Sequence, residues 1–190
     1  MAEGAEQLVL ASRSPQRKAI LEQLGVPFTI RPGDAVEEDS GAPEAVASEN
    51  ALRKALGAGC SPGEVVLGVD TLVATELEIW GKPPDEQAAR ETLRRLAGRT
   101  HRVVSGVALV REGEVTSATA ITAVTFREVG DELLDWYLAS GEWNGRAGGY
   151  AIQGRGAALV ERIDGDYLNV VGLPVATLLG IWPGLLDLTR

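Results

Sequence analysis

The segment 8–18 (LVLASRSPQRK) constrains the fold of this chain more than any other stretch, because it joins a strand signal directly to a helix start. Leu8 to Ala11 are four consecutive apolar residues, which predict a short buried strand. Ser14 is placed to cap a helix, and Pro15 then takes the first helical position, where a missing N–H costs nothing. The segment therefore predicts a strand, a tight polar loop and a helix in immediate succession.

The predicted helix start is also a candidate anion site. Unpaired N–H groups and the helix dipole favour a negative charge at a helix N-terminus. Arg17 and Lys18 add full positive charges there, and the hydroxyls of Ser12 and Ser14 precede them. The alternative is an ordinary capped helix whose basic residues are solvated.

Strand and helix signals alternate along the rest of the chain, which predicts an α/β fold. Gly25 is a natural stop for the first helix, whose buried face is marked by Ala19, Ile20 and Leu24. Asp164-Gly165 predicts a hairpin turn. Further helices are predicted at 43–56, 85–97, 132–139 and 175–182, and further strands at 26–30, 65–69, 76–80, 100–110, 115–126, 157–163 and 167–171.

The bulk composition is typical of one domain that binds neither nucleic acid polymers nor membranes. The chain has 190 residues, 45% of them hydrophobic, so it can bury a core. Its net charge of −9 argues against non-specific binding to nucleic acids or anionic membranes, but allows a local basic pocket. No run approaches the roughly 18 apolar residues of a membrane span. Cys60 is the only cysteine and residues 1–6 lack a signal-peptide pattern, so a cytoplasmic location is expected.

Asp70 is the strongest single candidate for catalysis. It follows Val65 to Val69, an apolar run that predicts a central strand. A carboxylate at the end of a buried strand is costly unless it is used or paired, and ligands gather at strand ends in open α/β sheets. This position favours a functional acid over one that only caps a loop.

Other charged groups have both a functional and a plain interpretation. The loop 34–39 carries four carboxylates, which either are solvated or bind a divalent metal. Arg53 and Lys54 lie near the end of the helix 43–56, where cations also suit the helix dipole. Lys82 precedes Pro83-Pro84, and the fixed backbone of the prolines would hold it in one place.

The glycine-dense segment 141–156 is predicted to be a ligand-facing loop, because it is too polar and too rich in glycine to be core. Glycines allow a close approach to a ligand, and Gln153 offers a donor and an acceptor to a base edge. A mobile loop is the alternative. His101, the only histidine, is more typical of a surface or pairing residue than of a catalyst. With Cys60 far away in sequence, neither a zinc site nor a Cys–His nucleophile is predicted.

Together these residues indicate one kind of chemistry. The candidates are cations for a polyphosphate (Arg17, Lys54, Lys82), carboxylates for a metal or a base (Glu38, Asp70) and an amide for an uncharged ring (Gln153). No covalent nucleophile with a partner stands out. The inventory indicates hydrolysis of a phosphoanhydride by metal-activated water.

Five segments, in order, resemble the motifs of Maf proteins, which are nucleoside triphosphate pyrophosphatases. They are Ser12-Arg13-Ser14-Pro15-Gln16-Arg17, Gly68-Val69-Asp70-Thr71, Gly81-Lys82-Pro83, Gly148-Gly149-Tyr150-Ala151-Ile152-Gln153-Gly154 and Val171-Gly172-Leu173-Pro174. The resemblance implies one domain over residues 1–190, with an elongated mixed β-sheet flanked by helices, as in inosine triphosphatases, and a cleft between two lobes. It also implies a homodimer, and cleavage between the α- and β-phosphates with Mg²⁺ or Mn²⁺.

The resemblance also assigns roles to residues. Asp70 matches the family's proton acceptor and Lys82 one of its basic positions. Glu38 matches an acidic position in the same pocket, although the loop length leaves Glu37 possible. Asp70 and Glu38 are the expected metal ligands, and Asp70, Lys82 and Glu38 are the expected catalytic residues. The expected substrate-binding residues are Ser12, Ser14, Gln16, Arg17, Lys54, Thr71 and Gln153.

Three of these positions separate branches of the family. Asp70-Thr71 and Ile152-Gln153-Gly154 resemble the branch that acts on dTTP and UTP. The branch that acts on 7-methyl-GTP usually has tryptophan at position 16, glutamine after the aspartate and glutamate at position 153. This chain departs from the pyrimidine branch in two places: Gln16 replaces an arginine, and Gly145-Arg146 replaces Asp-Lys.

The resulting hypothesis is a cytoplasmic house-cleaning pyrophosphatase for dTTP, UTP or modified pyrimidine triphosphates. Asp70 would orient or deprotonate the attacking water. Arg17, Lys54 and Lys82 would neutralise charge on the leaving pyrophosphate. Two alternatives stay open: a pyrophosphatase for 7-methyl-GTP or another purine triphosphate, and a nucleotide-binding regulator of cell division with little turnover.

Overall fold

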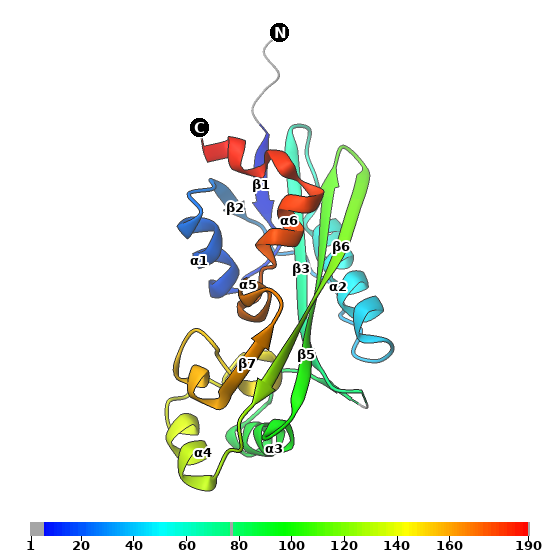
Figure 1. The fold of residues 1–190 in the computed structure, drawn as a ribbon. Helices are drawn as coiled ribbons and strands as arrows, with labels where there is room; N and C mark the ends of the chain where they lie inside the picture. The colour runs from blue at the N-terminus through cyan, green and yellow to red at the C-terminus, as the bar shows by residue number, and fades with distance from the viewer. Residues whose placement is uncertain (1–5, 77, 190) are drawn as a thin grey trace.

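The computed structural model describes residues 6–76 and 78–189 and has a mixed seven-stranded sheet with helices on both faces (Figure 1). In chain order, the elements are β1 (Gln7–Leu10), α1 (Pro15–Gln23), β2 (Phe28–Ile30), α2 (Pro43–Ala58), β3 (Glu64–Ala74), β4 (Ile79–Trp80), α3 (Glu86–Leu96), β5 (Thr100–Arg111), β6 (Glu114–Phe126), α4 (Asp131–Leu138), η1 (Ala147–Gly149), η2 (Arg155–Leu159), β7 (Val160–Asp164), α5 (Tyr167–Val171), α6 (Val175–Ile181) and η3 (Pro183–Thr189). The predicted α/β class with a mixed sheet is confirmed. Most of the segment 1–6 and one residue of the predicted strand 76–80 lie outside the described residues. Within these residues, no helix has the length and apolar character needed to cross a membrane.

The strand order is β2-β1-β3-β5-β6-β7, and β4 pairs with the end of β3. β1 is parallel to both of its neighbours, whereas all other pairs are antiparallel. The long strands β5 and β6 are joined by Glu112-Gly113, whose φ angles of 50° and 87° are both positive. Such a two-residue turn matches the twist of a hairpin, so the local sequence and the sheet agree here.

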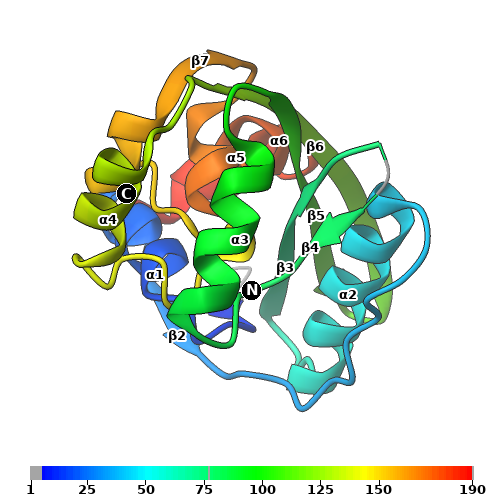
Figure 2. The same cartoon turned by 90° about the horizontal axis from the view of Figure 1, so that it is seen from below.

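Alternate side chains of the central strands pack into separate layers on the two faces of the sheet. Leu10 and Leu67 belong to the cluster under α1 and α6, whereas Val9, Val66 and their neighbours face α2. Figure 2 shows α2 on one side of the sheet and α1 on the other. A third cluster holds α3 and α4 against the far ends of β3, β5 and β6.

Two glycines bring α2 unusually close to the sheet. A Cβ atom on Gly68 of β3 would overlap the carbonyl oxygen of Ala51, and one on Gly106 of β5 would overlap that of Ala47. Only glycine permits this approach of a helix backbone to a strand. The contact places the side chains of α2 directly over the middle of β3.

The predicted hairpin at Asp164-Gly165 is wrong. β7 is followed by the short helix α5 and not by a second strand. Asp166 caps this helix by accepting a hydrogen bond from the Leu168 N–H at 2.8 Å, and buried Asn169 donates to the Val103 carbonyl at 3.0 Å. A mostly apolar segment of five residues fits a strand and a buried helix equally well, so packing against β5 decides between them.

Helix α1 has a buried stripe that differs from the predicted one. Arg17, Ile20 and Leu21 are buried, whereas Ala19 is exposed. The spacing of the three residues is that of one helix face, but its first member is a cation. The helix thus turns a guanidinium toward the interior of the protein.

Part of the glycine-dense segment is core, which corrects the prediction that it is too polar to be buried. Residues 148–152 are all buried. The Tyr137 hydroxyl donates to the Gly149 carbonyl at 3.2 Å and accepts from the Ala151 N–H at 3.0 Å. Burial raises the pKa of Tyr137 to about 12, so it remains a neutral brace for this segment.

His101 is a core residue, which makes the predicted pairing role right and the surface role wrong. It is 1% exposed, its ring packs edge-on against Phe126 and Tyr150, and its Nε2 lies 2.9 Å from the Tyr150 hydroxyl. Burial lowers the pKa of His101 from 6.5 to about 4.

Stability is therefore expected to fall as the pH drops from about 6.5 to about 4. In this window the unfolded chain takes up a proton at His101 that the folded chain does not, which lowers the free energy of unfolding by at most about 3 kcal/mol. Urea denaturation at pH 7 and pH 5 measures the loss. His101→Gln cannot titrate and should lose less stability between these two pH values. An equal loss in both proteins would contradict the prediction.

Candidate functional site

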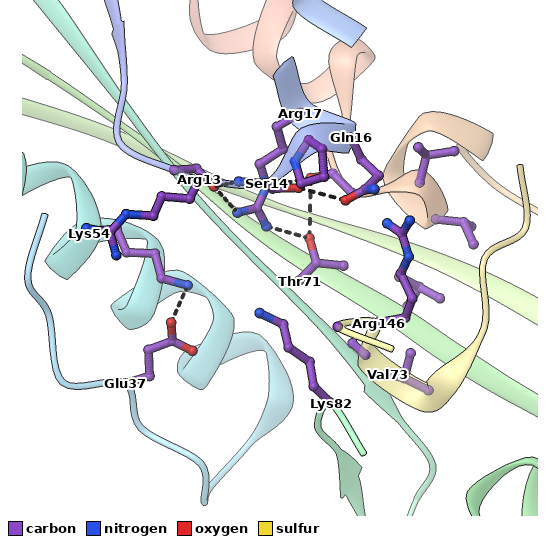
Figure 3. Close-up of a pocket in the computed structure, with 18 of the residues that line it drawn as sticks. Arg13, Ser14, Gln16, Arg17, Glu37, Lys54, Thr71, Val73, Lys82 and Arg146 are labelled. Atoms are coloured by element: carbon purple, nitrogen blue, oxygen red, sulfur yellow. Dashed lines mark hydrogen bonds and ion pairs between the residues drawn. The ribbon is translucent and has the colours of Figure 1, made fainter. Parts of the chain in front are cut away.

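A cavity of about 440 Å³ opens beside β3, where its parallel neighbour stops (Figure 3). β1 ends at Leu10 opposite Leu67, and β4 pairs with the same edge of β3 only from Val73 onward. Asp70 lies in the middle of β3, opposite Gly106, so the prediction that it stands at a strand end is wrong. The short β1, and not the end of β3, creates the opening.

The gap in the sheet lets side chains from both of its faces meet. Successive strand residues point to opposite faces, so Asp70 faces α2 and Thr71 faces α1. Accordingly, Asp70 Oδ1 lies 2.6 Å from Lys54 Nζ, and Thr71 Oγ1 accepts from Arg17 Nη2 at 3.2 Å. The two helices thereby contribute to one cavity although the sheet separates them elsewhere.

Arg17 is held by three neutral acceptors. Its Nε donates to the Gly172 carbonyl at 2.9 Å and its Nη1 to the Ser12 hydroxyl at 2.9 Å, in addition to the bond to Thr71. Burial lowers the pKa of Arg17, and the charges of Asp70 and Glu37 oppose this shift. A guanidinium stays protonated in proteins. A buried cation with neutral partners is stabilised by a nearby anion, so this side of the cavity favours a negatively charged group.

The loop before α1 exposes donors to the cavity. Ser14 occupies the predicted N-cap position, but its hydroxyl donates to Gln16 Oε1 at 3.1 Å and does not cap the helix. The Ser12 hydroxyl accepts from the Ser14 N–H at 3.2 Å. Ser12, Ser14 and Gln16 all line the cavity. Because no side chain caps the first turn, its N–H groups are available to a ligand.

Lys54 joins two carboxylates at one end of the cavity. Its Nζ lies 2.6 Å from Asp70 Oδ1 and 2.9 Å from Glu37 Oε1. Asn50 Nδ2 donates to the other oxygen of Asp70 at 3.1 Å. Asp70 is 5% exposed and does not itself line the cavity, whereas Lys54 and Glu37 do. The Oδ1 side of the Asp70 carboxylate is therefore covered by the ammonium group of Lys54.

The structure turns Glu37, and not Glu38, toward the cavity. The Glu38 carboxylate pairs with Arg53 at 2.8 Å and is absent from the lining. The carboxylates of Asp70 and Glu37 thus converge on the position of Lys54 Nζ. Their hard oxygens suit Mg²⁺ or Mn²⁺. Over residues 6–76 and 78–189, no group of three or more His, Cys, Asp or Glu residues could hold a metal ion.

Lys82 and Gln153 line the remaining wall of the cavity. The turn that carries Lys82 is anchored by the Gly148 N–H, which donates to the Gly81 carbonyl at 3.0 Å. In Figure 3 the amino group of Lys82 points into the space between Lys54 and Thr71. It has no hydrogen-bond or ion-pair partner in the part of the chain that the structure describes, so its charge is available to a ligand.

Sequence reasoning missed the roles of Asn50 and Arg146. Asn50 lies on the otherwise apolar face of α2, between Ala47 and Ala51, and this polar interruption was a usable signal. Arg146 lines the cavity, and its Nε is buried without a partner among the described residues. Burial also lowers the pKa of Arg146. The departure from the family pattern at this position therefore places a guanidinium in the site.

The charge of the cavity is opposite to that of the whole protein. Among the residues that the structure describes, the lining contains five cationic residues, Arg13, Arg17, Lys54, Lys82 and Arg146, but only one carboxylate, that of Glu37. The chain as a whole carries −9. In Figure 3, Glu37 and Lys54 lie at one end and Val73 and Arg146 at the other. Such a cavity fits a polyphosphate that carries a less polar group.

A mixed sheet interrupted beside its central strand, with a cationic cavity in the gap, defines an α/β protein with a cavity suited to an anion. The chain belongs to the Maf family, since the family model described as "Maf-like protein" matches residues 7–182. This agrees with the resemblance carried by the five motifs.

Similar proteins come from bacteria and archaea. A protein of Exiguobacterium sibiricum named dTTP/UTP pyrophosphatase is 46% identical over 172 residues, 88% of this chain and 87% of its own length. One of Symbiobacterium thermophilum with the same name is 46% identical over 175 residues, 90% of this chain and 89% of its own. One of Pyrococcus furiosus, also so named, is 38% identical over 179 residues, 92% of this chain and 93% of its own.

Proposed function

We propose that this chain is a nucleoside triphosphate pyrophosphatase that hydrolyses dTTP and UTP to the nucleoside monophosphate and pyrophosphate. The observation that carries the proposal is the cationic cavity built around Lys54, Lys82 and Arg17, next to the buried carboxylate of Asp70. Relatives that are 38% to 46% identical over most of the chain and are named dTTP/UTP pyrophosphatase support it.

In this proposal Asp70 is the proton acceptor. A water oxygen adds to the α-phosphorus, one of its protons goes to Asp70, and the bond between that phosphorus and the α–β bridging oxygen breaks. The bridging oxygen and the electron pair leave with pyrophosphate. Lys54, Lys82 and Arg17 stabilise the charge that develops there, which is how fixed cations promote phosphoryl transfer. Ser12, Ser14 and the first turn of α1 would hold the phosphate oxygens.

A divalent cation fits the acidic end of this cavity. Asp70 and Glu37 direct oxygens at the position that Lys54 Nζ occupies in this structure, at distances of 2.6 Å and 2.9 Å from that nitrogen. Mg²⁺ at phosphate sites is usually held by one or two carboxylates together with substrate oxygens and waters. Such an ion would screen the phosphate charge, and Lys54 would then be free to contact the phosphates.

The substrate base would lie at the end of the cavity away from Glu37. The lining there includes Val73, and Gln153 also borders the cavity. A side-chain amide can donate to and accept from a pyrimidine edge, whereas a glutamate could only accept. Gln16 and Thr71 border the same cavity and would complete the contacts that set base preference.

Pyrophosphate release measured over a panel of nucleoside triphosphates tests this function. With Mg²⁺ or Mn²⁺ present, the highest kcat/KM is expected for dTTP and UTP. A preference for 7-methyl-GTP or another purine triphosphate would replace the pyrimidine assignment. Tight nucleotide binding without release of pyrophosphate would instead indicate a nucleotide-binding regulator.

Matched substitutions distinguish the two neighbouring acids as metal ligands. Glu37→Gln is expected to lower kcat/KM roughly tenfold or more and to raise the Mg²⁺ concentration needed for half-maximal activity, because Glu37 faces Lys54. Glu38→Gln should have a smaller effect on both, because its carboxylate pairs with Arg53. The reverse order would assign the metal to Glu38, as the family resemblance implied.

We also propose that the enzyme is a cytoplasmic homodimer and that its chain forms one domain with two lobes. The single cysteine is compatible with a reducing compartment. The cavity borders residues from both the cluster under α1 and the cluster around α3. Size-exclusion chromatography with light scattering tests the dimer, since a monomeric mass at working concentration would exclude it.

A further inference from the structure

We propose that Asn50 is a positioning residue for hydrolysis, and that its side chain fixes both the carboxylate of Asp70 and the acidic loop 34–39. The inference rests on the proposed function for its kinetic part. Asn50 is 1% exposed and has no cavity atom of its own, so it would act through its partners and not on the substrate.

Asn50 clamps the backbone of the acidic loop at one residue. Its Oδ1 accepts from the Glu38 N–H at 2.7 Å, and its Nδ2 donates to the Glu38 carbonyl at 2.9 Å. This pair of bonds copies the way one strand residue pairs with another. The loop has no regular secondary structure, so the clamp replaces the support that a neighbouring strand would give.

The clamp explains which acid faces the cavity. Successive side chains of an extended segment point in opposite directions. With the backbone of Glu38 held by Asn50, the Glu38 side chain pairs with Arg53 and the preceding side chain, Glu37, reaches Lys54. A shift of the loop by one residue that placed Asp39 in the clamp would instead bring Glu38 to Lys54.

The same amide group orients Asp70. Its second N–H donates to Asp70 Oδ2 at 3.1 Å, while Lys54 contacts Oδ1 at 2.6 Å. Both N–H bonds and the oxygen of Asn50 are thus used. An amide is required at this position, because a carboxylate could accept from the Glu38 N–H but could not donate to Asp70.

Two substitutions probe these two effects. Asn50→Asp keeps an acceptor for the Glu38 N–H but loses the donors to the Glu38 carbonyl and to Asp70, whereas Asn50→Ala loses all three bonds. In both variants kcat is expected to fall about 10- to 100-fold. KM should change far less than kcat, because Asn50 does not touch the substrate. Activities are measured well below the melting temperature of each variant. Wild-type kcat in Asn50→Asp would overturn the positioning role.

Hydrogen–deuterium exchange tests the clamp without any activity. Asn50→Ala should speed exchange in a peptide that contains the Glu38 amide, and Asn50→Asp, which keeps only the bond to the Glu38 N–H, should speed it less. Exchange in Asn50→Ala as slow as in the wild type would overturn the clamp. If the wild-type protein releases no pyrophosphate from any nucleotide, the proposed function fails. The exchange measurement still shows whether Asn50 holds the loop 34–39.

A second buried asparagine provides the control for a merely structural effect. Asn169 is 0% exposed and donates to the Val103 carbonyl and the Thr122 hydroxyl, both at 3.0 Å. Asn169→Ala removes a comparable set of bonds that does not reach Asp70. Asn169→Ala should lower the melting temperature. It should not cause the large fall in kcat, with little change in KM, that is expected for the Asn50 variants. An equal kcat loss in Asn169→Ala would show that the Asn50 effect is not specific to positioning.

Discussion

Asp70→Asn is expected to lower kcat by about 10²- to 10⁴-fold while the protein stays folded, because a positioned general base contributes a factor of this size. An amide oxygen can still accept a hydrogen bond from Asn50 or Lys54, so the local contacts of Asp70 are largely retained. It cannot take a proton from water at neutral pH. The loss should therefore appear in kcat more than in KM.

Steady-state kinetics on dTTP with Mg²⁺ measures this loss, and circular dichroism with thermal melting checks the fold. Glu38→Gln serves as a second reference, since it changes the charge of the same region at an exposed position that pairs with Arg53. Near-wild-type turnover of Asp70→Asn would show that Asp70 is not the proton acceptor. The attacking water would then have to be placed elsewhere in the cavity.

Arg17→Met is expected to lower kcat/KM for dTTP by about 10²- to 10³-fold, which is the usual effect of removing a preorganised charge stabiliser. Arg17 is buried and is held by Ser12, Thr71 and Gly172, so its position does not depend on the substrate. Arg17→Lys keeps the charge, but its single nitrogen cannot reach the three acceptors that Nε, Nη1 and Nη2 of Arg17 contact. An intermediate loss is therefore expected for that variant.

Lys18→Met is the matched control, because Arg17 and Lys18 are neighbouring cations near the start of α1 and the sequence alone does not distinguish their roles. Lys18 is exposed, pairs with Glu22 at 3.6 Å and does not line the cavity. Its substitution should change kcat/KM by less than about twofold. Equal losses in Arg17→Met and Lys18→Met would mean that the net charge of α1, and not one fixed guanidinium, governs phosphate binding.

The local parts of the fold were predictable from the sequence. The strand–loop–helix unit at the start of the chain, the α2 helix and the long β5–β6 hairpin follow from periodicity, prolines at helix starts and a two-residue turn. These signals involve residues a few positions apart, so the chain carries them without tertiary contacts. The helix α5 is the exception, because its capping aspartate competes with a hairpin interpretation of the same residues.

The predicted site residues divide in a similar way. Eight of them converge as expected on one cavity: Ser12, Ser14, Gln16, Arg17, Lys54, Thr71, Lys82 and Gln153. Their convergence was inferred from motif order and from the resemblance to Maf proteins. The positions of the acids were not inferred correctly. Asp70 lies in the middle of β3 and pairs with Lys54, and Glu37 takes the place expected for Glu38.

The sequence by itself determined the identity of the elements and the set of residues that could meet a polyphosphate. Only the tertiary structure decided that β1 stops short beside β3, that Lys54 and Thr71 reach the resulting gap from opposite faces, and that Asn50 turns Glu37 inward. The reason is physical. Strand pairing and a clamp between helix and loop depend on contacts between distant residues, and the local pattern of the chain contains no record of their register.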